Sequence, residues 1–233
     1  MCARRASVLA VTVEPRHALP FFVLGVGEPR VGWEPSDRLA DFGGCLRHGE
    51  SPAHAAAREF FEETLGVISP WRGGAVGLAR VLEREHVLAV LEDARRVCYV
   101  VEIPWDPEIP RRFAHVRALL GGLDAACRGA PLTPAQQDAL LPACRATRRR
   151  RHRWLLDHPA VVRCHRARGV RGKPCVRGVR EGYLDIAKIV LCSFPQALAA
   201  SARGLVRRDH VDVLSAVADL LTQQHSRNRF LSS

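Results

Sequence analysis

The sequence lacks the features that mark secreted and membrane-spanning chains. Its eight cysteines stand singly, and none of them forms a C-x-x-C pair. A reduced intracellular compartment therefore fits better than a disulfide scaffold. No apolar run approaches the roughly 20 residues that a membrane-spanning helix needs. The apolar run at residues 7–13 is interrupted at Glu14 and has no cleavage pattern, so we expect a strand there, and a cytoplasmic protein without a membrane partner.

Lysine is almost absent, since Lys173 and Lys188 are the only two in 233 residues. The net charge of +11 therefore comes from arginine. Heavy use of Arg and Ala is typical of a GC-rich genome, which explains the choice of Arg over Lys. It does not explain why residues 141–182 carry 13 Arg and Lys against two acids, an excess that equals the net charge of the whole chain.

The most informative stretch is residues 43–67, a glycine pair, a short loop and a predicted helix. Ser51 is a good N-cap, Pro52 fits the first helical position, and Gly66 suits the exit. Three carboxylates share one helical face because they stand at positions i, i+3 and i+4, namely Glu59, Glu62 and Glu63. Like charges at this spacing repel, and a hard divalent cation such as Mg²⁺ or Mn²⁺ would turn that cost into a binding site.

This stretch resembles the signature box of the Nudix hydrolases. The resemblance rests on Gly44, five residues, Glu50, seven residues, and then Arg58-Glu59-Phe60-Phe61-Glu62-Glu63. The family usually has one residue between the Glu pair and the closing glycine, whereas here Thr64 and Leu65 precede Gly66. This extension changes the helix exit and lies beyond the acidic face. A looser resemblance, in the order of elements, is to Nudix proteins of large DNA viruses.

The resemblance implies a metal-dependent cleavage of pyrophosphate. Glu59, Glu62 and Glu63 would bind Mg²⁺ or Mn²⁺ together with the backbone carbonyl of Gly43, while Arg58 and Glu50 would orient the acidic face. The proton of the attacking water would pass to Glu62, to Glu63 or to a carboxylate from a later loop. The candidates for that later carboxylate are Glu83, Glu85, Glu92, Glu102 and Glu181.

The resemblance and the local patterns together predict an α/β fold, a Nudix-type α/β/α sandwich with a mixed sheet. A hydrophobic content of 47% supports a substantial core. We expect one domain over residues 1–233, with a helical, Arg-rich insert at about 107–180 and a closing helix at about 209–223. The expected strands are residues 6–13, 21–26, 39–42, 75–82, 86–91, 97–104 and 181–190. Expected insert helices cover residues 108–120, where Gly121 and Gly122 end the pattern, and 133–141, before Pro142.

The basic block is a candidate surface for RNA or another polyphosphate. Arginines that neutralise nucleic-acid phosphates release counterions, so binding would weaken steeply as salt rises. A solvated or disordered charge run and an inositol polyphosphate site are the alternatives. The residues proposed for this surface are Arg148, Arg149, Arg150, Arg151, Arg153 and Lys173. His152, His158, Cys164, His165 and Cys175 in the same block match no recognised zinc spacing.

Three functions follow from these features. The first is a pyrophosphohydrolase whose substrate is capped RNA, suggested by an acidic catalytic helix and a concentrated basic block in one chain. The second is a hydrolase of free (di)nucleotides or diphosphoinositol polyphosphates. The third is a non-catalytic RNA-binding protein on a Nudix scaffold, against which the intact Glu59, Glu62 and Glu63 argue.

Overall fold

The computed structural model describes residues 4–28, 38–84, 87–146, 158–163, 176–180 and 183–231. Its main strands are β1 (Arg5–Glu14), β2 (Leu19–Gly27), β3 (Leu39–Ala40), β4 (Phe42–Cys45), β5 (Ala89–Glu92), β6 (Arg96–Glu102) and β9 (Ile186–Ser193). The helices are α1 (Pro52–Glu63), α2 (Gly74–Glu83), α3 (Ile109–Arg128), α4 (Pro134–Ala146), α6 (Phe194–Ala202) and α7 (Arg208–Leu231). A separate two-stranded sheet joins β7 (Val161–Arg163) to β8 (Val176–Val179).

A mixed seven-stranded sheet is organised around β1. One edge of β1 runs parallel to β6. The other edge is shared by two antiparallel partners, because β4 pairs with residues 5–8 and β2 pairs with residues 10–14. Beyond β2, strands β3 and β9 extend the sheet. The two partners of β1 therefore diverge near its middle, and this divergence opens the cavity described below.

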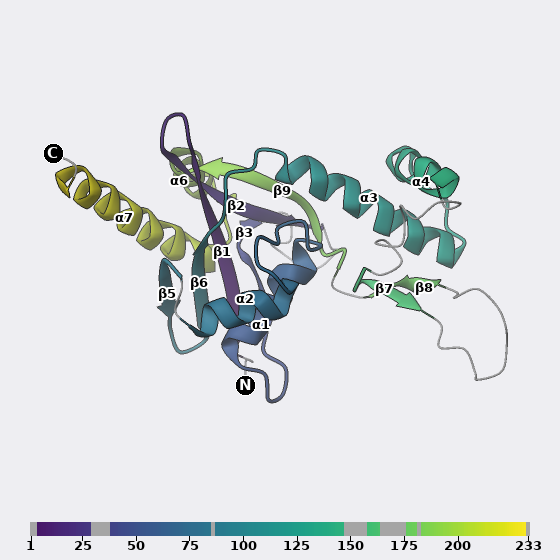
Figure 1. Ribbon diagram of the computed structural model, residues 1–233, viewed down its shortest axis with the longest axis horizontal. Helices are drawn as coiled ribbons and strands as arrows, with labels where there is room; N and C mark the ends of the chain where they lie inside the picture. Colours follow the sequence, from purple (N-terminus) through teal and green to yellow (C-terminus); the bar gives the residue numbers. More distant parts are fainter. Residues whose placement is uncertain are drawn as a thin grey trace.

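Helices cover both faces of the sheet, as Figure 1 shows. Side chains of β1 alternate between the two faces, so Ala6, Val8 and Ala10 join one core while Leu9 and Val11 join the other. The first core packs under α1, α2 and α3, and the second packs under α6 and α7. This arrangement confirms the predicted α/β/α layering around a mixed sheet.

Several predicted elements are present. The first two strands form the expected antiparallel hairpin, with Ala10 opposite Val23. Ser51 caps α1, where its side chain accepts a hydrogen bond from the His54 N–H at 3.3 Å. The strand predicted at residues 97–104 is β6, and the strand predicted at 181–190 is β9, which begins later, at Ile186.

The expectation of an extended segment at residues 75–82 is wrong, because the segment is helix α2. Its buried side chains, Leu78, Ala79 and Leu82, follow a helical spacing rather than the alternation of a strand. The strand predicted at residues 86–91 is confirmed in part, because the short strand β5 begins at Ala89 and ends at Glu92.

The glycine pair does not end the helix predicted at 108–120, since α3 continues through it to Arg128. Gly122 faces α4, and a Cβ there would lie 2.6 Å from Leu140 Cδ1. The glycine therefore serves the close approach of two helices. Helix α4 likewise continues past Pro142 to Ala146, and α7 runs beyond the expected residue 223 to Leu231.

The arginine run lies outside the residues that the structure describes. This holds for Arg148, Arg149, Arg150, Arg151, Arg153 and Lys173. Within the described part of the expected insert, α3 and α4 pack against each other and β7 pairs with β8.

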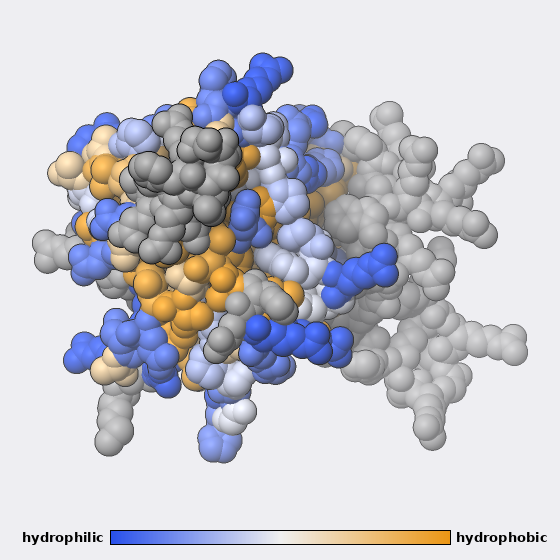
Figure 2. Space-filling model, turned by 60° about the vertical axis from the view of Figure 1, so that its left-hand side comes forward, coloured by the Kyte–Doolittle hydropathy of each residue, from blue (hydrophilic) through white to orange (hydrophobic). Residues whose placement is uncertain are grey.

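One side of the molecule, shown in Figure 2, displays an apolar area among charged side chains. Strand β5 lies on the left of Figure 1, the side that comes forward in Figure 2, and its Val90 is 41% exposed. Among the helices that the structure describes, none is long and apolar enough to cross a membrane.

Candidate active site

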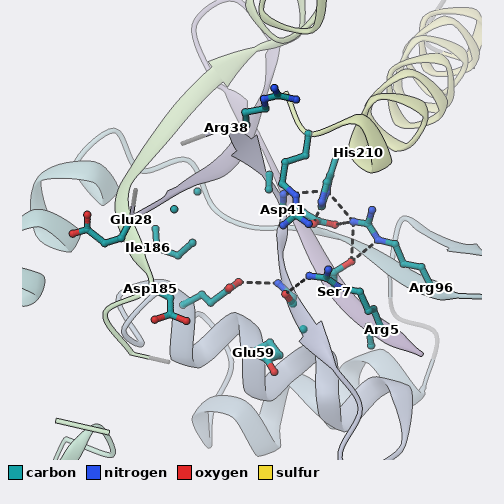
Figure 3. A pocket seen from close by; sticks show the side chains of 18 residues that line it. Arg5, Ser7, Glu28, Arg38, Asp41, Glu59, Arg96, Asp185, Ile186 and His210 are labelled. Atoms are coloured by element: carbon teal, nitrogen blue, oxygen red, sulfur yellow. Dashed lines mark hydrogen bonds and ion pairs between the residues drawn. The ribbon is translucent and has the colours of Figure 1, made fainter. Parts of the chain in front are cut away.

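A cavity of about 260 Å³ lies where β2 and β4 leave the same edge of β1. Glycines of β2 and β4 form part of its wall, so the backbone is accessible there. Charged side chains form most of the remainder, as Figure 3 shows. The acidic lining residues are Glu28, Asp41, Glu59, Glu63 and Asp185. The basic ones are Arg5, Arg38, Arg96, Arg207 and His210.

Helix α1 places Glu59 and Glu63 on this cavity. The Gly43 N–H donates a hydrogen bond of 2.8 Å to Glu63 Oε2, which ties the end of α1 to β4. Glu59 lies against Gly44, where an added Cβ would be 2.4 Å from its Oε1. The glycine of the sequence motif is therefore needed for the close approach of the Glu59 carboxylate to the backbone of β4.

Glu62 faces a different environment. It does not line the cavity, and its carboxylate lies 3.4 Å from Arg58 Nη1 and 3.6 Å from Arg47 Nη2. Burial raises the pKa of Glu62, and the two arginines act against that shift. The structure thus brings two of the three predicted carboxylates together at the cavity and directs the third to a pair of arginines.

Arg58 connects the box residues. Its guanidinium contacts Glu50 at 2.8 Å and Glu59 at 2.6 Å, and it donates to the Cys45 carbonyl at 3.3 Å. The hydrogen bonds with Glu50 hold the Arg58 pKa above its usual range, and the same contact lowers the pKa of Glu50. Arg58 therefore links Glu50, Glu59 and the backbone of β4.

The carboxyl of Glu63 lies among other acidic groups. Burial raises its pKa well above the usual value, and repulsion from Glu59, Asp41 and Asp185 acts in the same direction. The hydrogen bond from Gly43 opposes the shift without overcoming it. A carboxyl with such a pKa, in a cavity, is typical of a functional site.

The backbone carbonyl of Gly43, a predicted metal ligand, contacts an arginine side chain. Arg5 Nη2 donates to that oxygen at 3.3 Å. Within the described ranges of the chain, no group of three or more His, Cys, Asp and Glu side chains is placed to hold a metal ion.

The floor of the cavity is a buried ionic network that the sequence did not indicate. The side chain of Asp41 is 3% exposed and lies 2.7 Å from His210 Nδ1. It also forms an ion pair with Arg96, whose Nη2 lies 3.2 Å from Ser7 Oγ. Burial alone would raise the pKa of Asp41, but His210 and Arg96 outweigh it and hold that pKa well below its usual range.

The opposite wall contains Arg38 and Arg207, which the sequence also did not indicate. They flank a backbone contact in which the Leu39 N–H donates to the Leu205 carbonyl at 2.8 Å and the Arg207 N–H donates to the Leu39 carbonyl at 3.0 Å. Only the tertiary fold joins these segments, so one sequence without structure holds no signal for this wall.

The later carboxylates proposed as bases lie elsewhere. Glu83 contacts His54 at 3.1 Å, Glu92 pairs with Arg4, and Glu102 is exposed. None of these three lines the cavity, and Glu85 and Glu181 lie outside the described residues. Asp185, just before β9, is the later carboxylate near Glu63.

The exit of α1 accommodates the additional residue of the motif. Leu65 takes a left-handed conformation with φ 54° and is buried, and Gly66 follows with φ 64°. His158, from the expected insert, lies with Nε2 3.1 Å from the Leu65 carbonyl. The extension therefore creates a contact between the helix exit and the insert.

Comparison with known proteins finds similarity among solved structures. No protein-family model and no curated protein matches the chain. Among solved structures, the chain is similar to a crystal structure of a Nudix hydrolase from M. Smegmatis, RenU, with 12% sequence identity and a TM-score of 0.29. The similarity covers 63% of this chain and 86% of that one.

Proposed function

We propose that this chain is a Nudix-type, divalent-metal-dependent hydrolase that cleaves the diphosphate of a nucleoside-diphosphate-linked substrate. The observation that carries the proposal is the placement of Glu59 and Glu63 of the motif helix on one cavity, where the pKa of Glu63 is raised. A protein that used the motif helix only as a scaffold would not need two repelling carboxylates at a cavity wall.

The donor chemistry fits a hard divalent cation. Glu59 and Glu63 supply oxygen ligands only, which Mg²⁺ and Mn²⁺ prefer, and the charge that raises the pKa of Glu63 would be neutralised on binding. The Gly43 carbonyl would join them after releasing Arg5. A bound cation would shield phosphate oxygens and lower the pKa of a coordinated water.

The residues of the chain then have distinct tasks. Arg58, held by Glu50, fixes the position of Glu59 through their contact of 2.6 Å. Asp41 and Asp185 are carboxylates outside the motif helix that raise the pKa of Glu63. Asp41 is held by Arg96 and His210, so we assign the proton of the attacking water to Asp185.

Capped RNA is the first substrate that we propose, with cleavage inside the phosphate chain of the cap. The support is the concentration of net charge +11 in residues 141–182, which suits a long polyanion. If RNA labelled in the cap phosphates releases no capped nucleotide while free dinucleoside polyphosphates are cleaved, capped RNA is excluded.

Free nucleotides and diphosphoinositol polyphosphates are the second candidate. The cavity volume of about 260 Å³ favours them, because it lies at the small end for ligand pockets and suits a phosphate chain better than a large cap structure.

A substrate panel tests the function. The full chain would be incubated with Mg²⁺ or Mn²⁺ and capped RNA, dinucleoside polyphosphates, NADH, ADP-ribose or a diphosphoinositol polyphosphate, and the products would be separated by ion-exchange chromatography. We expect a metal-dependent cleavage of a phosphoric anhydride in at least one substrate. Salt-sensitive RNA binding without any turnover would instead indicate a non-catalytic RNA-binding protein.

A further inference from the structure

The same cavity has a second charged end that the proposed hydrolysis does not use. Arg38 and Arg207 both line the cavity and are partly buried. In the close-up of Figure 3, Arg38 lies at the opposite end of the pocket from Glu59. A ligand that fills the cavity would therefore meet the Glu59 carboxylate at one end and the Arg38 guanidinium at the other.

The other arginines near the cavity already have partners within the protein. Arg96 pairs with Asp41, Arg5 donates to the Gly43 carbonyl, and Arg117 pairs with Glu28. Arg207 also interacts within the protein. Arg38 differs, because it makes no ion pair or hydrogen bond with any residue that the structure describes. A partly buried cation without a protein partner is costly unless a ligand anion provides one.

The backbone brings Arg38 and Arg207 close together in the fold. Leu39 forms a parallel bridge with Val206, and two hydrogen bonds fasten these segments. Arg38 precedes one bridging residue and Arg207 follows the other, so both side chains start from the same short bridge. The long helix α7 begins directly after Arg207, and the positive end of its dipole adds to the potential of this wall.

We propose that Arg38 and Arg207 form a second anion subsite that binds a phosphate group of the substrate beyond the diphosphate that is cleaved. This inference rests on the proposed function for the location of the cleaved bond. Guanidinium groups recognise phosphate through paired hydrogen bonds, so the subsite selects substrates that carry an additional phosphate. That phosphate comes from a polyphosphate chain of at least three phosphates or from the sugar of the nucleoside.

The first test compares substrates of different phosphate content. We would measure kcat/KM of wild type, Arg38→Gln, Arg207→Gln and the control Arg203→Gln, which changes an exposed arginine outside the cavity. The substrates are dinucleoside di-, tri- and tetraphosphates, and NADH against NADPH. We expect the two cavity variants to lose roughly 10- to 100-fold on the substrate that carries the additional phosphate and less than about 3-fold on its matched partner.

Two substrate comparisons, dinucleoside polyphosphates of different length and NADH against NADPH, identify where the additional phosphate lies in the substrate. A selective loss on the longer dinucleoside chains assigns the subsite to the phosphate chain, and a selective loss on NADPH assigns it to the sugar phosphate. Arg38→Lys keeps the charge without the paired donors and should give an intermediate loss. An equal loss on all substrates, or no loss, overturns the subsite while leaving the proposed hydrolysis intact.

A second test needs no turnover. Titration calorimetry with inorganic tripolyphosphate, in a metal-free buffer, should show binding that Arg38→Gln and Arg207→Gln weaken about 10-fold and Arg203→Gln does not. If no substrate is hydrolysed but this pattern holds, the proposed function fails and the subsite stands. Tripolyphosphate binding that is unchanged in both cavity variants overturns the subsite.

Discussion

Two carboxylates of the same cavity are held in opposite electrostatic states. Glu63, on the wall that α1 forms, is half-buried beside Glu59 and accepts a hydrogen bond from the Gly43 N–H, and desolvation raises its pKa. Asp41, on the floor, is also buried, but His210 and Arg96 hold its pKa low. Burial is common to both, so the difference lies in the partners.

The wall with Glu59 and Glu63 is the proposed reactive side of the cavity, and the floor with Asp41 has a structural role. On the acidic wall, the neighbouring carboxylates raise the energy of ionised Glu63, which costs stability and would be relieved by a bound cation. On the floor, Asp41 pairs with Arg96 of β6 and His210 of α7. Arg96 also contacts Ser7 of β1, so the network joins these elements to the segment that enters β4. Substitutions on the wall should therefore affect activity, and substitutions on the floor should affect folding.

The largest effect should come from removing charge on the wall. Glu63→Gln keeps an acceptor for the Gly43 N–H but loses the negative oxygen, and we expect hydrolysis to fall by roughly 1,000-fold. Glu62→Gln should lose less, because Glu62 contacts arginines outside the cavity. Steady-state rates with the best substrate of the panel test this, with exposed Glu102→Gln as the control. Equal rates for wild type and Glu63→Gln would show that the wall is not the reactive one.

The floor should respond in stability. Asp41→Asn leaves Arg96 and His210 buried without a counter-charge, and we expect the free energy of unfolding to fall by about 3 kcal/mol. Urea denaturation followed by circular dichroism measures this change, with the exposed Asp212→Asn as the matched control. A change no larger than that of the control would mean that the network does not join the elements.

The geometry of the wall can be disturbed without removing its charge. Gly44→Ala would place a Cβ 2.4 Å from Glu59 Oε1, so the carboxylate must move while the fold remains. We expect activity to fall by about 100-fold, since small displacements of reacting groups have effects of that size. Thermal unfolding should change little, and a variant with wild-type kcat would show that the position of Glu59 is unimportant.

The smallest expected effect is the change in the free energy of unfolding when Glu63 is replaced, and this change depends on pH. A raised pKa in the folded state means that Glu63 supports folding below its unfolded pKa and opposes folding as pH rises through its folded pKa. In the presence of EDTA, Glu63→Gln should therefore be more stable than wild type at neutral pH, by about 1 kcal/mol or roughly 2–4 °C in Tm. The difference should vanish near pH 4, and a variant that is less stable at pH 7 would contradict the assignment.

The acidic wall could be predicted because its determinants are close together in the chain. Ser51, Pro52 and the spacing of Glu59 and Glu63 fix a helix and its polar face within a few turns. Even there, the rotation of Glu62 toward Arg47 and Arg58 depends on a loop whose path the sequence did not reveal.

The floor and the basic wall could not be predicted, since they join distant segments. Asp41 and His210 are 169 positions apart, and only the pairing of β4 with β1 and the placement of α7 bring them together. The wrong prediction of an extended segment at residues 75–82, where the structure has helix α2, has another cause. The run that begins at Gly74 is short and apolar, and short apolar runs fit a helix or a strand until their packing partners are known.

The proposal that Glu59 and Glu63 bind a divalent cation is tested most directly by measuring the affinity of the cavity for Mn²⁺. We would titrate Mn²⁺ into the metal-free full chain and follow free Mn²⁺ by electron paramagnetic resonance, for wild type, the Glu59→Gln/Glu63→Gln variant and the control Glu102→Gln. We predict saturable binding in wild type and the control, and at least about 10-fold weaker binding in the double variant. Equal Mn²⁺ binding by all three proteins would contradict it.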